Sequence, residues 1–190
     1  SEEYLGKALK KNVARNQVVI ASKVYFNEGR LSRQAIMREI DGTLSRLGTD
    51  YLDLYIIHRF DYDTPIEETM EALHDLVKAG KVRALGASAM YGYQFYNMQL
   101  AARDNGWTPF SAMENHYNLL YREDERELLP ICKQMKVSLM PYSPLAAGAF
   151  DIKLTAEDLA YLEEPYVPHE IVGAIDKNPA QGVILLDEKK

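Results

Sequence analysis

Short runs of apolar and β-branched residues alternate with helix-like segments along this chain as far as Met140. The clearest run, Leu52 to Ile57, is largely apolar and has the length of a strand. Nearly continuous apolarity is typical of a strand that is buried on both faces. Four further strands are expected at Val18–Ala21, Lys81–Ser88, Phe110–Glu114 and Val137–Met140. This alternation predicts a parallel sheet with crossover helices, because parallel neighbours need long connections.

Helix boundaries between these runs are marked by capping residues. Ser32 offers an N-cap for a helix that ends at Gly48. Thr64, Pro65 and Glu67 predict a capping box at the start of the next helix. A further helix is expected from Glu123 to Met135, and the short connections leave little room for other structure.

The parallel sheet could be an open doubly wound sheet or a barrel. No glycine-rich dinucleotide fingerprint and no Walker-type loop follows any predicted strand, which favours a (β/α)8 barrel. About five strands are expected, whereas a closed barrel needs eight and typically about 250 residues. The pattern changes near Ala149. We therefore expect an incomplete barrel over residues 1–148, and a C-terminal helix with an irregular tail over 149–190.

Charge and composition exclude several classes of protein. The net charge of −6 argues against non-specific nucleic-acid binding. No stretch is apolar for long enough to span a membrane, and the start lacks a signal-peptide core. A single cysteine, Cys132, fits a reducing compartment, so we expect a cytoplasmic protein.

Polar side chains stand where the predicted strands end. They are Lys23, His58, Ser88, Glu114 with Asn115 and His116, and Tyr142 with Ser143. In a barrel the carboxyl ends of the strands meet at one mouth, so these side chains are expected to converge on a small molecule. The alternative is that each one satisfies only local backbone groups. A metal-dependent hydrolase is disfavoured, because the four histidines of the chain lack paired metal-ligand spacing.

Six segments, in this order, resemble the aldo-keto reductase family. They are SEEYLGKALK, VVIASKV, LSRLGTDYLDLYIIHRFD, KAGKVRALGAS, ENHYNLLYRE and MPYSPLAAG. The branch to which the chain is most similar includes aryl-alcohol-dehydrogenase-like enzymes and the potassium-channel β-subunits. The resemblance implies an (α/β)8 barrel that reduces an aldehyde or ketone with hydride from NADPH. Aromatic carbonyl compounds are among the substrates that it implies. In that reaction a tyrosine protonates the carbonyl oxygen.

The resemblance also implies roles for individual residues. Lys23 matches the lysine that acidifies the tyrosine, and His58 matches the histidine that orients the carbonyl. The residues implied to contact NADPH are Ser88, Glu114, Tyr142, Ser143 and Leu145. Among these, Ser88 would hold the nicotinamide amide and Tyr142 would stack on the ring. No metal is implied.

Four departures from the family pattern stand out. The acid tyrosine and its aspartate lie just upstream of the S-E-x-x-L-G motif, and this chain begins at that motif. Ala89 stands where an asparagine is common, and Glu114 stands where a glutamine is common. The first, seventh and eighth strands of the barrel are expected to be missing.

These departures leave two functions open. One is an NADP-dependent carbonyl reductase in truncated form, whose activity is in doubt without the acid tyrosine. The other is a non-catalytic relative that senses nucleotides or binds a partner. An incomplete barrel also exposes unpaired strand edges, so a homo-oligomer that covers them is expected as one outcome.

Overall fold

The computed structural model describes residues 1–146 together with Thr155 and Glu157. Five strands form one parallel sheet in chain order. They are β1 (Ala21–Val24), β2 (Leu52–Ile57), β3 (Val82–Ser88), β4 (Phe110–Glu114) and β5 (Ser138–Leu139). The helices are α1 (Glu2–Asn12), α2 (Arg33–Leu47), α3 (Ile66–Lys78), α4 (Gly92–Asn105) and α5 (Leu128–Gln134), with 3-10 turns η1 (Arg15–Gln17) and η2 (Glu123–Arg126).

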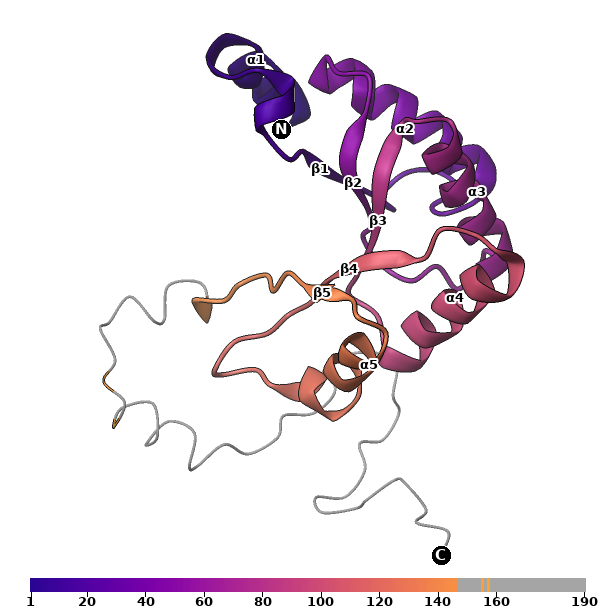
Figure 1. Ribbon diagram of the computed structural model, residues 1–190, viewed down its shortest axis with the longest axis vertical. Coiled ribbons are helices and arrows are strands. Elements are labelled where there is room, and N and C mark those ends of the chain that lie inside the picture. The colour runs from indigo at the N-terminus through magenta and orange to yellow at the C-terminus, as the bar shows by residue number, and fades with distance from the viewer. Residues whose placement is uncertain (147–154, 156, 158–190) are drawn as a thin grey trace, which may run out of the picture.

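Helices cross over between consecutive strands, as the alternating sequence pattern predicts. Figure 1 shows α2, α3 and α4 lying along one side of the sheet. This confirms the predicted class, an α/β fold of the (β/α)8 barrel type with five parallel strands in the described residues. The predicted C-terminal helix and tail over 149–190 lie outside the described residues, apart from Thr155 and Glu157. No helix in the described part of the chain combines the length and the apolarity needed to cross a bilayer.

The two faces of the sheet have different cores. Tyr55 and Ile57 point to the helix-covered face and belong to the large core cluster. On the opposite face, Leu54, Ile56 and Ala112 form a small separate cluster. This second face is where polar side chains from the strands meet, as described below.

The first strand starts later than the sequence predicts. A strand was expected at Val18–Ala21, but β1 runs over Ala21–Val24. Asp53 on β2 is the reason: its Oδ2 accepts hydrogen bonds from Ile20 N at 2.9 Å and from Arg15 at 2.7 Å. Ile20 O still accepts backbone hydrogen bonds from Asp53 N at 3.0 Å and from Leu54 N at 3.2 Å, so just before the strand the Asp53 carboxylate takes up the Ile20 N–H alone. As a consequence, Lys23 lies within β1 rather than beyond its end.

Helix starts were predicted with mixed success. Ser32 does cap α2, and Gly48 ends that helix with φ of 67°, as expected. The capping box at Thr64 is wrong: α3 has Pro65 as its N-cap and no side-chain cap bond. Thr64 Oγ1 donates instead to Asp61 at 2.7 Å, so the buried carboxylate organises the loop after β2.

The helix expected from Glu123 to Met135 is split into two pieces. The turn η2 ends at Arg126, Glu127 has non-helical backbone angles, and α5 begins at Leu128. Pro130 accounts for the break, since it has no N–H to donate to the carbonyl of Arg126 and its ring would collide with that carbonyl. In the first turn of α5 the same proline is tolerated.

Candidate active site

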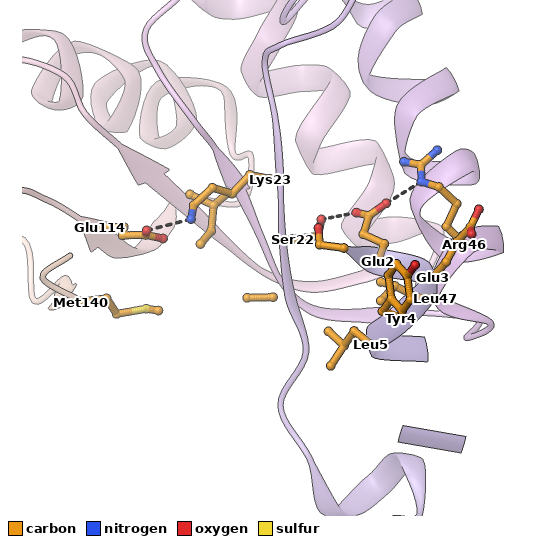
Figure 2. Close-up of a pocket in the computed structure, with 13 residues that line it drawn as sticks. Glu2, Glu3, Tyr4, Leu5, Ser22, Lys23, Arg46, Leu47, Glu114 and Met140 are labelled. Carbon is orange, nitrogen blue, oxygen red and sulfur yellow. Dashed lines mark hydrogen bonds and ion pairs between the residues drawn. The ribbon is translucent and has the colours of Figure 1, made fainter. Parts of the chain in front are cut away.

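An ion pair between Lys23 and Glu114 crosses the second face of the sheet. Lys23 Nζ lies 2.7 Å from Glu114 Oε1, and both side chains are partly exposed (Figure 2). The pair joins β1 to β4, with β2 and β3 between them. Three strand spacings in a flat sheet amount to about 14 Å, which is more than a lysine and a glutamate side chain span together. The sheet therefore curves, and this face is the concave one.

A glycine on β3 leaves room for the ion pair on the concave face. Lys23 is in register with Ile56 on β2, and Ile56 is in register with Gly86 on β3. A Cβ on Gly86 would lie 3.1 Å from Ile56 Cγ1, so the glycine leaves this space to the Ile56 side chain and adds no bulk of its own. Lys23 and Glu114 can consequently meet above β2 and β3.

A cavity of about 560 Å³ opens beside the ion pair, along the free side of β1. Its lining combines residues of α1 with residues of the concave face, and Figure 2 shows Lys23 and Glu114 on one side of β1 and Glu2 on the other. Glu2 accepts hydrogen bonds from Ser22 Oγ at 2.5 Å and from Arg46 Nε at 2.6 Å. Burial alone would raise the pKa of Glu2, but these two donors outweigh it and lower that pKa. Glu2 thus ties α1 to β1 and α2 as a charged carboxylate.

His58 follows β2 directly and lies close to the ion pair. Its backbone N–H donates to Val24 O at 2.9 Å, and its ring meets Phe26 edge-on with centroids 4.9 Å apart. Burial lowers the pKa of His58, and the positive charge of Lys23 lowers it further, against an opposing effect of Glu114. The imidazole is therefore neutral at pH 7.

Ser88 ends β3 and is buried beside the ion pair, in register with Glu114. Ala89 follows it with φ of 45°, in the left-handed region. Asparagine tolerates that region better than alanine does. This gives a physical reason for the asparagine that the resemblance to aldo-keto reductases leads one to expect at this position.

Tyr142 lies just after β5, across from the end of β4. Its N–H donates to Asn115 O at 2.8 Å, and its ring stacks on His116 with centroids 5.0 Å apart and planes 5° from parallel. The residue is 39% exposed. Burial, followed by the negative charge of Asp124, raises the pKa of its hydroxyl. Ser143, the next residue, has φ of 52°.

A second cavity, of about 620 Å³, lies at the carboxyl ends of the strands. Most of its apolar lining is aromatic: Tyr25, Phe60, Tyr62, Tyr91, His116, Tyr121 and Tyr142. Charged groups on the wall are Arg59, Glu123, Asp124, Arg126 and Glu127. Aromatic walls with a few polar groups are typical of small-molecule sites. The end of the sheet at which the cavity lies is also where barrels place their chemistry.

The structure brings most of the predicted site residues together. Lys23 and Glu114 form an ion pair, and the charges of both shift the pKa of His58. Ser88 is in register with Glu114 on the neighbouring strand. Tyr142 lies at the second cavity, and the charge of Glu114 acts on its hydroxyl.

Two predicted cofactor residues are less well placed. Ser143 is held through its carbonyl, which accepts from Asn118 Nδ2 at 3.0 Å. Leu145 is exposed and lines neither of the two cavities described here. Their assignment to the pyrophosphate therefore stays a prediction.

Sequence reasoning left several lining residues out. Tyr25 and Tyr91 follow strand ends, and both line the second cavity. His116 was expected among the polar residues at the strand ends but received no role, and Tyr121 and Asp124 were not assigned to a site. The aromatic residues that follow Glu114 in the segment HYNLLY are the signal that could have identified two of them.

The residues present can accommodate a nicotinamide ring, with one restriction. Tyr142 offers a partly exposed flat ring at the mouth of the cavity. Glu114 is already paired with Lys23, and a carboxylate accepts hydrogen bonds without donating any.

Within the described ranges, no three His, Cys, Asp or Glu side chains are grouped in a way that could hold a metal ion.

Comparison with known proteins places these features in a family. The aldo/keto reductase family model matches residues 1–165. The chain belongs to this family.

Curated relatives in fungi support the assignment. An aldo-keto reductase of Fusarium vanettenii is 56% identical over 127 residues, which cover 67% of this chain and 34% of the relative. Versiconal hemiacetal acetate reductase of Aspergillus parasiticus is 45% identical, over 78% of this chain and 50% of that protein. A putative aryl-alcohol dehydrogenase of Schizosaccharomyces pombe is 39% identical, over 83% and 53%. The chain therefore spans about a third to just over half the length of these relatives.

Proposed function

We propose that this aldo/keto reductase chain reduces an aldehyde or ketone to the alcohol with NADPH, aromatic carbonyl compounds among its substrates. The observation that carries the proposal is the Lys23–Glu114 ion pair at 2.7 Å in the lining of the first cavity, together with Tyr142 in the aromatic cavity at the strand ends. Relatives named as an aryl-alcohol dehydrogenase and as a hemiacetal acetate reductase support an aromatic or carbonyl-related substrate.

His58 and Lys23 would act on the carbonyl oxygen. The neutral imidazole of His58 can donate one hydrogen bond to that oxygen and so fix the direction of the carbonyl. The Lys23 ammonium, held in place by Glu114, would stabilise the negative charge that develops on the oxygen. Bound NADPH would supply the hydride for the carbonyl carbon, and solvent water would supply the proton that completes the alcohol on the oxygen.

The cofactor would be held mainly at its nicotinamide end. Tyr142 would stack on the nicotinamide ring, and Ser88 and Glu114 would contact the carboxamide. Ser143 and Leu145 would line the pyrophosphate. Because Glu114 can only accept, its contact with the carboxamide would be limited to the N–H side of that amide.

Titration of NADPH fluorescence and turnover of an aromatic aldehyde by the purified chain test this proposal. We expect His58→Ala to lower kcat/KM by about 10²- to 10³-fold, the usual effect of removing one positioned hydrogen-bond donor to a developing oxyanion, with little change in NADPH affinity. His74→Ala is the matched control, since His74 lies on α3 and bonds to Thr108 at 3.0 Å, away from the site. A folded chain that neither binds NADPH nor consumes it would contradict the proposal.

One observation favours a second function, that of a non-catalytic nucleotide sensor or partner-binding relative. The ion pair at 2.7 Å already compensates the charge of Lys23, so the ammonium is less available to a substrate. NADPH binding without turnover in the same assays would support this second function. Turnover that His58→Ala abolishes would count against it.

We also propose a cytoplasmic location. The single cysteine, Cys132, is a buried free thiol on α5. Burial raises the pKa of this thiol to about 11, so little reactive thiolate forms at neutral pH. A buried free thiol is compatible with a reducing compartment.

A further inference from the structure

We infer that His116 and Asn118 are positioning residues that hold the Tyr142 ring as a rigid platform for a planar ligand ring. The inference rests on the proposed function, in which the ligand ring is the nicotinamide of NADPH. Neither residue needs to touch the ligand: both would act through Tyr142.

Three aromatic rings form a continuous stack after β4. The rings of Tyr121 and His116 have centroids 4.4 Å apart and planes 19° from parallel. His116 in turn stacks on Tyr142 at 5.0 Å and 5°. The imidazole is thus covered on both faces, and Tyr142 is the terminal ring of the stack.

The outer face of Tyr142 is where a fourth ring can be added. Tyr142 is 39% exposed and lines the 620 Å³ cavity. Among the described residues, His116 is the one ring that stacks against it. A flat ligand ring entering the cavity would continue the stack in the same orientation, because parallel offset rings attract.

Asn118 holds both ends of the stack. It is 7% exposed, and its Oδ1 accepts from Tyr121 N at 3.0 Å and from Leu120 N at 2.9 Å. Its Nδ2 donates to Ser143 O at 3.0 Å and lies 3.4 Å from His116 Nε2. The Asn118 side chain therefore holds Tyr121, which stacks on His116, and also Ser143, which follows Tyr142.

Backbone contacts also hold His116 and Tyr142 in place. The backbones of His116 and Tyr142 form an isolated parallel bridge, and Tyr142 N donates to Asn115 O at 2.8 Å. Ser143 follows with φ of 52°, a strained conformation for a residue other than glycine. Such strain persists where surrounding contacts hold the backbone in place, and it is common at ligand sites. These contacts therefore order the Tyr142 ring before a ligand binds, which reduces the conformational entropy lost on binding.

Two substitutions of similar size at His116 separate stacking from packing. His116→Leu keeps apolar bulk but removes the flat ring, and we expect it to weaken NADPH binding about 3- to 10-fold, the range of a lost ring pair. His116→Phe restores a flat ring and is expected to rescue affinity to within about twofold of the original chain. At saturating NADPH, kcat should be unchanged in both, since the stack acts on binding.

Asn118→Asp tests the link to Ser143. The aspartate keeps the acceptor for Tyr121 N but loses the donor to Ser143 O. We expect weaker NADPH binding and an altered near-ultraviolet circular dichroism signal from the tyrosines in the ligand-free chain. Fluorescence titration and circular dichroism together give a readout that does not depend on turnover.

The outcomes distinguish this inference from the proposed function. If the original chain binds NADPH and His116→Leu binds it equally well, the positioning role is overturned and the reductase proposal stands. Equal losses in the leucine and phenylalanine variants also overturn it, because a flat ring would then make no difference. If the original chain binds no NADPH at all, both proposals fall.

Discussion

At the scale of single residues, the charge on His58 links the site to the stability of the fold. Burial, and then the nearby Lys23 ammonium, lower the pKa of this imidazole in the folded chain. In the unfolded chain its pKa returns to about 6.5. Below that pH the unfolded state binds more protons than the folded state does, so His58 destabilises the fold as the pH falls. Above about pH 6.5 the effect is absent.

Replacing His58 with glutamine should remove this pH dependence. We expect the free energy of unfolding of the original chain to decline from pH 7 to pH 5, and that of His58→Gln to decline less, because glutamine does not titrate. Urea denaturation at a series of pH values measures the difference. Equal declines in the two proteins would show that other groups dominate in this window.

Two buried or partly buried carboxylates, Asp53 and Asp61, affect the free energy of unfolding at a lower pH than His58 does. They should therefore not interfere with the urea denaturation series between pH 7 and pH 5. Burial alone would raise the pKa of Asp53 and of Asp61, but hydrogen bonds and neighbouring arginines outweigh it and lower both. Their stabilising effect is present above the unfolded pKa of about 3.9 and is lost only as the pH falls below it.

At the scale of elements, the packing of α1 against α2 depends on a close backbone approach at Gly6. A Cβ there would lie 2.3 Å from Leu47 O at the end of α2. The hydrogen bond from Arg46 to Glu2 at 2.6 Å joins the same two helices. Because α1 also supplies part of the wall of the first cavity, its placement shapes the region beside Lys23.

Gly6→Ala decides between helix propensity and packing. In a free helix this change stabilises by about 1 kcal/mol. Here the clash with the backbone of Leu47 should dominate and cost about 1–3 kcal/mol, as overpacking does. Ala8→Ser on the exposed side of α1 is the control and should stay within about 0.5 kcal/mol. Thermal or urea unfolding measures both, and a stabilised Gly6→Ala variant would contradict the packing at this contact.

At the scale of the whole molecule, the described sheet ends in two edge strands, each with one side that is not paired. Within the described part, β1 pairs with β2 alone and β5 pairs with β4 alone. Free strand edges present unpaired N–H and C=O groups that attract further strands. Val19, next to the β1 edge, is an exposed apolar residue, and Leu139 on β5 is another.

The 21.6 kDa chain should therefore associate with itself when purified alone. We expect light scattering coupled to gel filtration to give at least the mass of a dimer at micromolar concentrations. Val19→Lys should shift the distribution toward the monomer, because charge near an edge discourages strand addition. A monomer at all concentrations would show that these edges are not available for pairing.

Strands and site residues differed in how well the sequence predicted them. The runs that became β2, β3 and β4 were located to within about a residue, and β2 is the clearest of them because it is nearly continuous in apolar residues. The start of β1 was missed, since it depends on Asp53, a residue distant in sequence that binds Ile20 N. The false capping box has the same cause, because Asp61 takes the hydroxyl of Thr64. Local patterns cannot show which distant side chain competes for a hydrogen bond.

The sequence by itself determined the alternation of strands and helices, the polar residues at the strand ends, and the family resemblance, because all three are written in local order and spacing. Only the tertiary structure decided that Lys23 meets Glu114 and that His116 lies between Tyr121 and Tyr142. These contacts depend on the curvature of the sheet and on where the loops after β4 and β5 come together. Curvature and loop position result from packing across the whole domain, so no short stretch of sequence specifies them.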